Sequence, residues 1–482
     1  MKHVVGGWPN EYDPTEPADI QKYEKKMYRE ISLGFAPATK AMAQGAKNCI
    51  LQNNEIDLFE EYFADETPEH NNEQISIKTM MILKDPNQIK RAATKIAWHP
   101  DFSEPRIGVT YAMLRFQQMP KDMPRQSYIW NLHNPNHPEK TLLPPSPLCC
   151  MAFNNKSSEI IAGGSYNGSI SFFDTRMGNS AGVIKPFKTT NLEKSHHDPV
   201  YNVEWTAIGK TGSELVSSST DGRLLWWDYK EGNTPTDQFV LNEEFPDKDG
   251  NPKNKILGST SLCYNPEAGP LKYLIGTEQG YILQAQKRKT IDIQQKFGID
   301  GGKHHGPVYS LTRNPGHNKF FLSVGDWQAK IWTEELKSPI MQTRYHSALL
   351  TDGCWSNTRP GLFYLSRMDG FLDVWDFYYR QNEVAYSQKI SDSPLTAISC
   401  QNNMIAVGDA EGTVSIMKLC NALHEPANKE KEIMQAIFER EFRREKMLEV
   451  AKKFAQGDPK KPIKKGGATA TIDAEAEAKQ KA

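Results

Sequence analysis

The feature that most constrains the fold is a hairpin signature that recurs along the chain. It is clearest in Ser217–Asp228, SSSTDGRLLWWD, where an Asp-Gly turn leads into a β-rich run that ends in Trp-Asp. Asp-Gly between strand-like runs is a strong hairpin signal, because Gly accepts the positive φ that tight turns require. In three copies the turn Asp precedes a Trp by six residues: Asp221 and Trp227, Asp326 and Trp332, and Asp369 and Trp375.

The copies recur with a period of roughly 40–55 residues, which is typical of WD40-type β-propeller blades. We divide residues 86–420 into seven blades, of which the fourth, Thr260–Leu283, is the most degenerate. Seven blades can close into a ring that hides the strand edges an open array would expose. The sequence therefore predicts an all-β, seven-bladed WD40 β-propeller with an N-terminal helical arm and a C-terminal helix.

Residues 1–85 carry no blade pattern and are predicted to form an extended and helical arm that binds partner chains. Ala18–Leu33 has the pattern of a charged helix, and Ala38–Phe63 that of a second helix, broken near Asn53. The end of the second helix places four apolar residues on one face, namely Ile56, Phe59, Tyr62 and Phe63. Two short amphipathic helices cannot fully bury such faces against each other. We therefore expect them to dock on the propeller or on a partner.

The pattern changes again after the last blade. Residues 426–456 predict a strongly charged helix in which apolar residues, including Phe438 and Phe442, interrupt the charge. Gly457-Asp458-Pro459 ends that helix. Residues 457–482 contain almost no apolar side chains, and we expect them to be disordered.

Composition excludes several classes of function. The chain has 58 Lys and Arg against 59 Asp and Glu, so nothing in its net charge indicates nucleic acid or an anionic membrane as a partner. No apolar run approaches the ~20 residues that span a bilayer, and Met1–Trp8 does not resemble a signal peptide. We expect a soluble protein. The seven cysteines are scattered without C-x-x-C spacing, which favours reduced thiols that pack as small hydrophobic groups.

Histidines recur four residues before an apolar strand start, at His196, His304 and His346. A metal site is one interpretation of the paired histidines. A structural role is the other, because a His in that loop can reach the turn Asp and the Trp N–H of its blade and so satisfy buried polar groups. The periodic spacing favours the structural role, since a metal site would not need it. The predicted sets are His196/Asp221/Trp227, His304/Asp326/Trp332 and His346/Asp369/Trp375.

The sequence offers no catalytic constellation. It has no G-x-S-x-G elbow and no phosphate-binding P-loop, so we expect no cofactor and no enzyme activity. A rigid ring with helical arms is suited to binding other chains. One alternative is a generic WD40 adaptor that reads a peptide motif on a propeller rim. Another is an enzyme of propeller fold, for which the sequence shows no clear set of groups at the channel.

Several stretches resemble the WD-repeat intermediate chains of dynein, and more narrowly the second type of intermediate chain in the axonemal outer arm. WD turns alone would be generic to all such propellers. The specific resemblance lies in segments outside the repeats, QNNEIDLFEEYF at Gln52–Phe63, IKRAATKIAWHP at Ile89–Pro100 and FEREFRREKMLE at Phe438–Glu449. Together with GGWP at Gly6–Pro9, it covers the chain from about residue 3 to about residue 450.

The resemblance implies a non-catalytic subunit of the ciliary motor, located in the cytoplasm and in the axoneme of the cytoskeleton. It implies that the propeller holds the helical tail of a dynein heavy chain and pairs with a second, different intermediate chain. The segment before the propeller would bind dynein light chains, with a roadblock-type dimer nearest the ring. The partner-binding candidates are then Trp8, Ile56, Phe59, Tyr62 and Phe63, with Phe438 and Phe442 docking on the propeller or on a neighbour. Relatives carry a longer segment before Gly6, so we expect light-chain sites of that upstream segment to be absent.

Overall fold

The computed structural model describes residues 12–13, 15–55, 75–101, 103, 105–113, 120, 122–179, 182–207, 214–246, 252–288, 291–299 and 302–456. The chain separates into two compact units. One unit combines Met1–Glu60 with Arg443–Ala482, and the other is Glu61–Phe442. The second unit contains all of the β structure described below.

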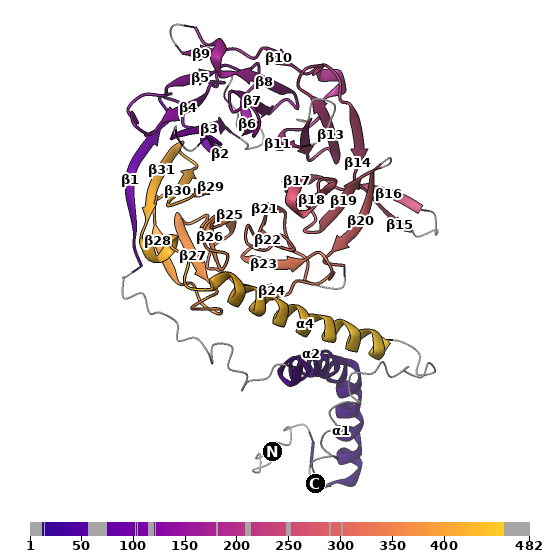
Figure 1. The fold of residues 1–482 in the computed structure, drawn as a ribbon. Coiled ribbons are helices and arrows are strands. Elements are labelled where there is room, and N and C mark those ends of the chain that lie inside the picture. Colours follow the sequence, from indigo (N-terminus) through magenta and orange to yellow (C-terminus); the bar gives the residue numbers. More distant parts are fainter. Residues whose placement is uncertain are drawn as a thin grey trace, which may run out of the picture. The chain divides into compact units, whose positions relative to one another are not determined.

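Seven antiparallel sheets stand radially around a central axis in the unit Glu61–Phe442, as Figure 1 shows. The strands of blades 1 to 3 are β2 (Ala92–Trp98), β3 (Arg106–Ala112), β4 (Ser127–Asn131) and β5 (Lys140–Leu142); β6 (Leu148–Phe153), β7 (Ile160–Ser165), β8 (Ile170–Asp174) and β10 (Lys188–Thr189); and β11 (Val200–Thr206), β12 (Glu214–Ser219), β13 (Arg223–Asp228) and β14 (Asp237–Val240). The short strand β9 (Val183–Ile184) adds to β5 in parallel.

Blades 4 to 6 follow the same order. Their strands are β17 (Ser259–Tyr264), β18 (Lys272–Thr277), β19 (Ile282–Lys287) and β20 (Ile291–Phe297); β21 (Val308–Arg313), β22 (Phe320–Gly325), β23 (Gln328–Thr333) and β24 (Met341–Gln342); and β25 (Leu350–Trp355), β26 (Leu362–Arg367), β27 (Phe371–Asp376) and β28 (Tyr386–Lys389). Between blades 3 and 4, β15 (Asn242–Pro246) and β16 (Pro252–Ile256) form a separate hairpin. The seven-bladed WD40 propeller predicted from the sequence is confirmed.

Blade 7 combines both ends of the repeat region. Its inner strands are β29 (Leu395–Gln401), β30 (Met404–Asp409) and β31 (Thr413–Leu419), and its outer strand is β1 (Ile77–Lys84), which comes from before blade 1. Strands β1 and β31 pair antiparallel, from Ile77 opposite Leu419 to Lys84 opposite Thr413. In Figure 1 the indigo strand lies beside the yellow one. The prediction that residues up to 85 stay outside the propeller is therefore wrong for β1, because a closed ring needs its last blade completed.

The hairpin turns explain the repeated Asp-Gly dipeptide. Gly370, between β26 and β27, has φ +86°, and a Cβ at this position would lie 1.9 Å from the carbonyl oxygen of Ser391. Only glycine accepts this conformation and this approach without strain. Blade 5 uses a tighter turn, in which Asp326 takes a positive φ of 55°.

Buried tryptophans link neighbouring blades. The indole N–H of Trp205 on β11 donates to the carbonyl of Ala152 on β6 at 3.0 Å, and that of Trp355 on β25 donates to Thr312 on β21 at 3.3 Å. Each bond joins the inner strand of one blade to that of the blade before it. Apolar side chains of both blades fill the space between the sheets, as where Phe172 of blade 2 packs in the same cluster as Trp227 of blade 3. This packing makes the ring rigid.

The N-terminal helices of the other unit form one continuous stretch. α1 (Pro17–Glu30) passes through a π-helical turn, η1 (Ile31–Phe35), into α2 (Ala36–Glu55). We predicted two separate helices and a break near Asn53, whereas the structure joins them and continues α2 to Glu55. No helix within the described residues is long and apolar enough to cross a membrane.

The remaining helices are the 3₁₀ turns η2 (Thr175–Met177), η3 (Leu192–Lys194) and η4 (Pro266–Ala268), and the helices α3 (Asn421–His424) and α4 (Glu430–Gln456). The predicted tail 457–482 and the partner-binding candidates Trp8, Ile56, Phe59, Tyr62 and Phe63 lie outside the described residues.

Candidate partner-binding surfaces

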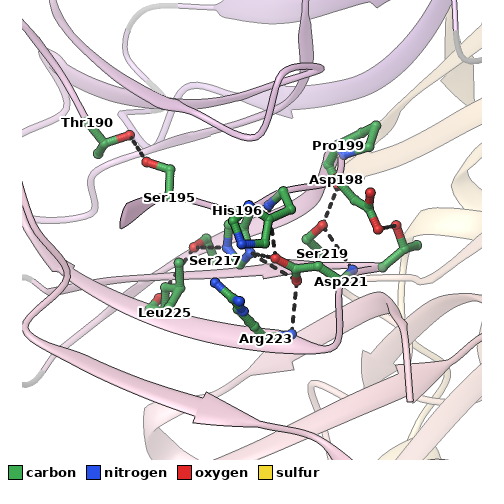
Figure 2. A network of polar contacts seen from close by, with 12 residues as sticks. Thr190, Ser195, His196, Asp198, Pro199, Ser217, Ser219, Asp221, Arg223 and Leu225 are labelled. Carbon is green, nitrogen blue, oxygen red and sulfur yellow. Dashed lines mark hydrogen bonds and ion pairs between the residues drawn. The ribbon is translucent and has the colours of Figure 1, made fainter. Parts of the chain in front are cut away.

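A serine hydroxyl connects the predicted polar set of blade 3. His196 Nε2 lies 2.7 Å from Ser217 Oγ, and the indole N–H of Trp227 donates to the same oxygen at 2.9 Å. His196 Nδ1 lies 3.1 Å from a carboxylate oxygen of Asp221 (Figure 2). Asp221 also accepts the backbone N–H groups of His197 and Arg223. The structure thus brings the three predicted residues together, through a serine that our sequence analysis did not name.

Blade 5 repeats the arrangement around Ser323. Its hydroxyl oxygen lies 2.7 Å from His304 Nε2 and accepts the indole N–H of Trp332 at 2.8 Å. Asp326 lies 3.5 Å from His304 Nδ1. Burial lowers the pKa of His304, so this imidazole is mainly neutral near pH 7. Its Nε2 shares the Ser323 hydroxyl with Trp332 and its Nδ1 faces the Asp326 carboxylate, which is a structural role.

The predicted set of blade 6 is wrong in its acid. His346 Nδ1 lies 2.9 Å from Asp373, on β27, and Asp369 instead pairs with Arg367. Two side chains differ from blade 3, because Asp373 stands where blade 3 has Leu225, and Leu365 occupies the position that Ser217 holds there. Without that hydroxyl nothing bridges His346 Nε2 to the indole of Trp375, and neither nitrogen has a partner within the described residues. Ser217 and Leu365 both stand four residues before the turn Asp, so the sequence did contain this signal.

The carboxylates of these sets are held ionised. Burial would raise the pKa of Asp221, but the hydrogen bonds from His196 and from backbone N–H groups hold that pKa below its ordinary value. The pKa of Asp373 is lowered in the same sense, against burial, by His346 and Ser387. In both blades, the ionised carboxylate and its hydrogen bonds fix the loop that precedes the blade to the blade itself.

The central channel shows no catalytic arrangement in the part of the chain that the structure describes. A cavity of about 330 Å³ is lined by the inner strands, and its side chains include Lys95, Glu204, Cys263, Cys354 and Cys400. Burial raises the pKa of Glu204 to about 7 and that of the Cys263 thiol to about 11. Such thiols are poor nucleophiles at neutral pH. Among the described residues no group of His, Cys, Asp and Glu could hold a metal ion.

Helix α4 begins against blades 5 and 6. Phe438 is fully buried and its ring centroid lies 4.8 Å from that of Phe320, while Met434 and Ile437 join the same cluster. Phe442 packs against the cluster and is partly buried. Phe438 and Phe442 therefore contact the chain's own propeller. Of the two docking sites that we considered for them, the propeller is the one that the structure shows.

A buried arginine fixes the start of α4. Arg359, in the loop between β25 and β26, lies 2.9 Å from Glu430 and 2.8 Å from Asp376, and donates to the carbonyl of Ala422 at 2.8 Å. Glu430 also accepts the backbone N–H of Ala427 at 2.9 Å, as an N-terminal cap. No local sequence pattern indicated this pair, because its members are 71 residues apart.

The helical stretch α1–η1–α2 carries exposed apolar side chains. No residue of α1 is buried, and Tyr28 and Leu33 are 72% and 71% exposed. Four more large apolar side chains are exposed along the same stretch: Met27, Ile31, Met42 and Ile50. Scattered exposure of one such residue is ordinary, but a helix with this many is typical of a docking segment. This is the candidate partner-binding surface of the first unit.

The fold defines a class: a seven-bladed WD40 propeller with N-terminal helices and a C-terminal helix. A family profile described as "Dynein axonemal intermediate chain 3 WD40 domain" matches residues 259–419. The chain is 40% identical over 461 residues to "Dynein, 70 kDa intermediate chain, flagellar outer arm" of Chlamydomonas reinhardtii, which covers 95% of this chain and 78% of that protein.

Two further relatives agree. "Dynein intermediate chain 3, ciliary" of Heliocidaris crassispina is 41% identical over 93% of this chain and 73% of its own length, and "Dynein axonemal intermediate chain 2" of Homo sapiens is 41% identical over 93% and 72%. The chain therefore belongs to the family of axonemal outer-arm dynein intermediate chains, which are non-catalytic subunits of the ciliary and flagellar motor. The resemblance inferred from the sequence is confirmed.

Proposed function

We propose that this chain is a scaffold of the outer dynein arm, which holds a heavy-chain tail, a second, different intermediate chain and light chains in fixed positions. The observation that carries this proposal is the set of exposed apolar side chains on α1–η1–α2. An amphipathic helix gains most of its stability by burying its apolar face against another element. A partner chain can supply that element.

The propeller supports the same proposal in a different way. Its inter-blade hydrogen bonds and buried tryptophans make a rigid platform, and α4 is fixed to it through Arg359 and Phe438. A rigid platform loses little conformational entropy when a partner binds. We assign light chains, of which a roadblock-type dimer is the first candidate, to the helical segment, and the heavy-chain tail and the second intermediate chain to the propeller.

The test uses the full chain in ciliated cells whose own copy has been replaced. Tyr28→Glu with Leu33→Glu puts charge on the exposed apolar side chains of the helical stretch without touching the ring. We expect light chains to be lost from the complex recovered through this chain, while the heavy chain stays bound. Lys25→Glu, on an exposed position of the same helix, is the matched control for added charge. Full recovery of light chains with the double variant would contradict the assignment.

A further inference from the structure

One face of blades 5 and 6 carries a group of exposed aromatic and apolar side chains. We call it the turn face, because the hairpins that join the second and third strands of each blade lie on it. Trp327 is in the turn between β22 and β23, Met368 in the turn between β26 and β27, and Tyr345 in the loop between β24 and β25. Tyr345 is 66% exposed and Trp327 43%.

Backbone hydrogen bonds hold these loops together. The N–H of His346 donates to the carbonyl of Trp327 at 2.9 Å, that of Leu350 to Asp326 at 2.8 Å, and that of Met368 to Leu349 at 2.9 Å. The three loops therefore form one fixed surface. Tyr309, the second residue of β21, is also exposed and lines the central cavity. We define the turn-face patch as Tyr309, Trp327, Tyr345 and Met368.

The fold does not require these residue types. At the corresponding turns blade 2 has Tyr166 and Asn167, blade 3 has Thr220 and Asp221, blade 4 has Glu278 and Gln279, and blade 7 has Glu411. The turn of blade 5 is made by the positive φ of Asp326, and the following Trp327 stays exposed. Trp and Tyr that gather at one exposed place are typical of the centres of protein interfaces.

The charge around the patch is positive. Arg344 and Lys303, in the loops before blades 6 and 5, are exposed, and neither has a carboxylate partner within the described part of the chain. The nearby carboxylates are already engaged, Asp326 by the loop of His304 and Asp369 by Arg367. A complementary partner would present apolar side chains flanked by Asp or Glu.

The strands reach this face end-on, so it offers loops and turns and no strand edge to which an extended peptide could add. The first turns of α4 pack against the other face of the same blades, at the loops that contain His317 and Arg359. The chain's own docked helix therefore leaves the turn face open. An amphipathic helix whose apolar stripe has acidic flanks matches both the apolar side chains and the charge of the patch.

We propose that the turn-face patch docks such an amphipathic, acidic-flanked helix from another chain of the assembly. This rests on the scaffolding function proposed above and adds its place on the propeller and the chemistry of the partner segment. Trp327 and Tyr345 are the apolar anchors, and Arg344 pairs with the acidic flank.

The test is site-specific photo-crosslinking in the full chain, with p-benzoylphenylalanine in place of Trp327, in ciliated cells that carry this copy alone. The matched control replaces Met177 in blade 2. This side chain is 67% exposed and follows the end of β8, on the face opposite the turn face. Mass spectrometry identifies the cross-linked peptide. We expect position 327, but not 177, to label a segment of another chain with apolar residues at helical spacing and Asp or Glu beside them. Labelling of this chain alone, of a segment without those features, or of nothing overturns the proposal.

A peptide with the labelled sequence then gives the affinity. Trp327→Ala should weaken its binding to the purified full chain by at least about 30-fold, as for an interface centre. Arg344→Glu should weaken it and Arg344→Lys should largely preserve it, while a Met177→Ala control changes nothing. Equal affinity for the Trp327→Ala variant contradicts the proposal. If the wild-type chain co-purifies with the outer arm but position 327 labels nothing, only the patch is refuted; if it does not co-purify, the scaffolding function fails.

Discussion

The indole N–H of Trp98 in blade 1 donates to the carbonyl of Ser399 in blade 7 at 3.3 Å, across the seam where the ring closes. It is the same bond that Trp205 and Trp355 make between consecutive blades. The seam is therefore built like the contacts between blades 2 and 3 and between blades 5 and 6. The seam differs from the other blade contacts in how the chain is connected. The outer strand of blade 7, β1, comes from the segment that precedes blade 1.

Because β1 closes the ring, two neighbouring residues of this strand should contribute very differently to the free energy of unfolding. Leu83 is fully buried against blades 1 and 7, whereas Ile82 is about half exposed. Leu83→Ala should lower the free energy of unfolding by about 2–5 kcal/mol through the cavity it leaves. Ile82→Ala should lower it by less than about 1 kcal/mol. Chemical denaturation measures both, and equal losses would mean that β1 does not close the ring.

The serine at the centre of the blade 3 set can be separated from its neighbour. Ser217→Ala leaves His196 Nε2 and the Trp227 indole without their shared partner, and should cost about 1–3 kcal/mol. Ser218→Ala is the control, because the buried Ser218 hydroxyl has no partner within the described residues. We expect Ser218→Ala to be close to neutral in the same denaturation experiment. If the two variants unfold alike, the shared hydroxyl has no structural role.

Stability should fall as the pH rises through the titration of Glu204. Burial raises its pKa from 4.5 to about 7, so the folded protein binds a proton that the unfolded chain has already lost between these values. The free energy of unfolding therefore decreases from about pH 4.5 to about pH 7 by an amount on the order of 1–3 kcal/mol, and then levels off. Glu204→Gln should remove this slope. Glu193→Gln, at an exposed glutamate, should leave it unchanged, and a slope that survives Glu204→Gln would contradict the assignment.

Loss of Arg359 should release the start of α4. Arg359→Ala leaves the carboxylates of Glu430 and Asp376 buried without their cation, which typically costs about 3–5 kcal/mol. Hydrogen exchange should speed up in the first turns of α4 more than in blade 3. Lys431→Ala, on an exposed side chain of the same helix, serves as the control. Unchanged exchange in α4 with Arg359→Ala would mean that Phe438 and its neighbours suffice to hold the helix.

Much of this fold could be predicted from the sequence, because the blades of a propeller repeat the same sequence features at a regular period. Asp-Gly turns need glycine at positive φ, and several blades bury a Trp on their third strand, so both recur at the same place in several copies. The strand β1 could not be predicted in this way. It has no turn signature, and its partner β31 lies at the far end of the repeat region.

The sites were predictable to the extent that they are local. His196 and Asp221 follow from spacing within one repeat. The failure at Asp369 goes with Leu365 and Asp373, which replace a serine and a leucine of blade 3 and could have been noticed by comparing the blades. The pairing of Arg359 with Glu430 joins a propeller loop to a helix beyond the ring, and no periodic pattern links them. The turn-face patch could be identified only from the exposed fractions of its side chains in the structure. From the sequence alone, an aromatic residue near a strand is usually assigned to the core.

The central claim is that a rigid ring with helical extensions holds other dynein chains in place. The most direct measurement is purification of the tagged full chain from a salt extract of axonemes, followed by identification and stoichiometry of every co-purifying chain. We predict a heavy chain, a second, different intermediate chain and light chains in fixed ratio, with all ATPase activity depending on the heavy chain. Recovery of this chain alone, or in a complex without dynein, would contradict the claim.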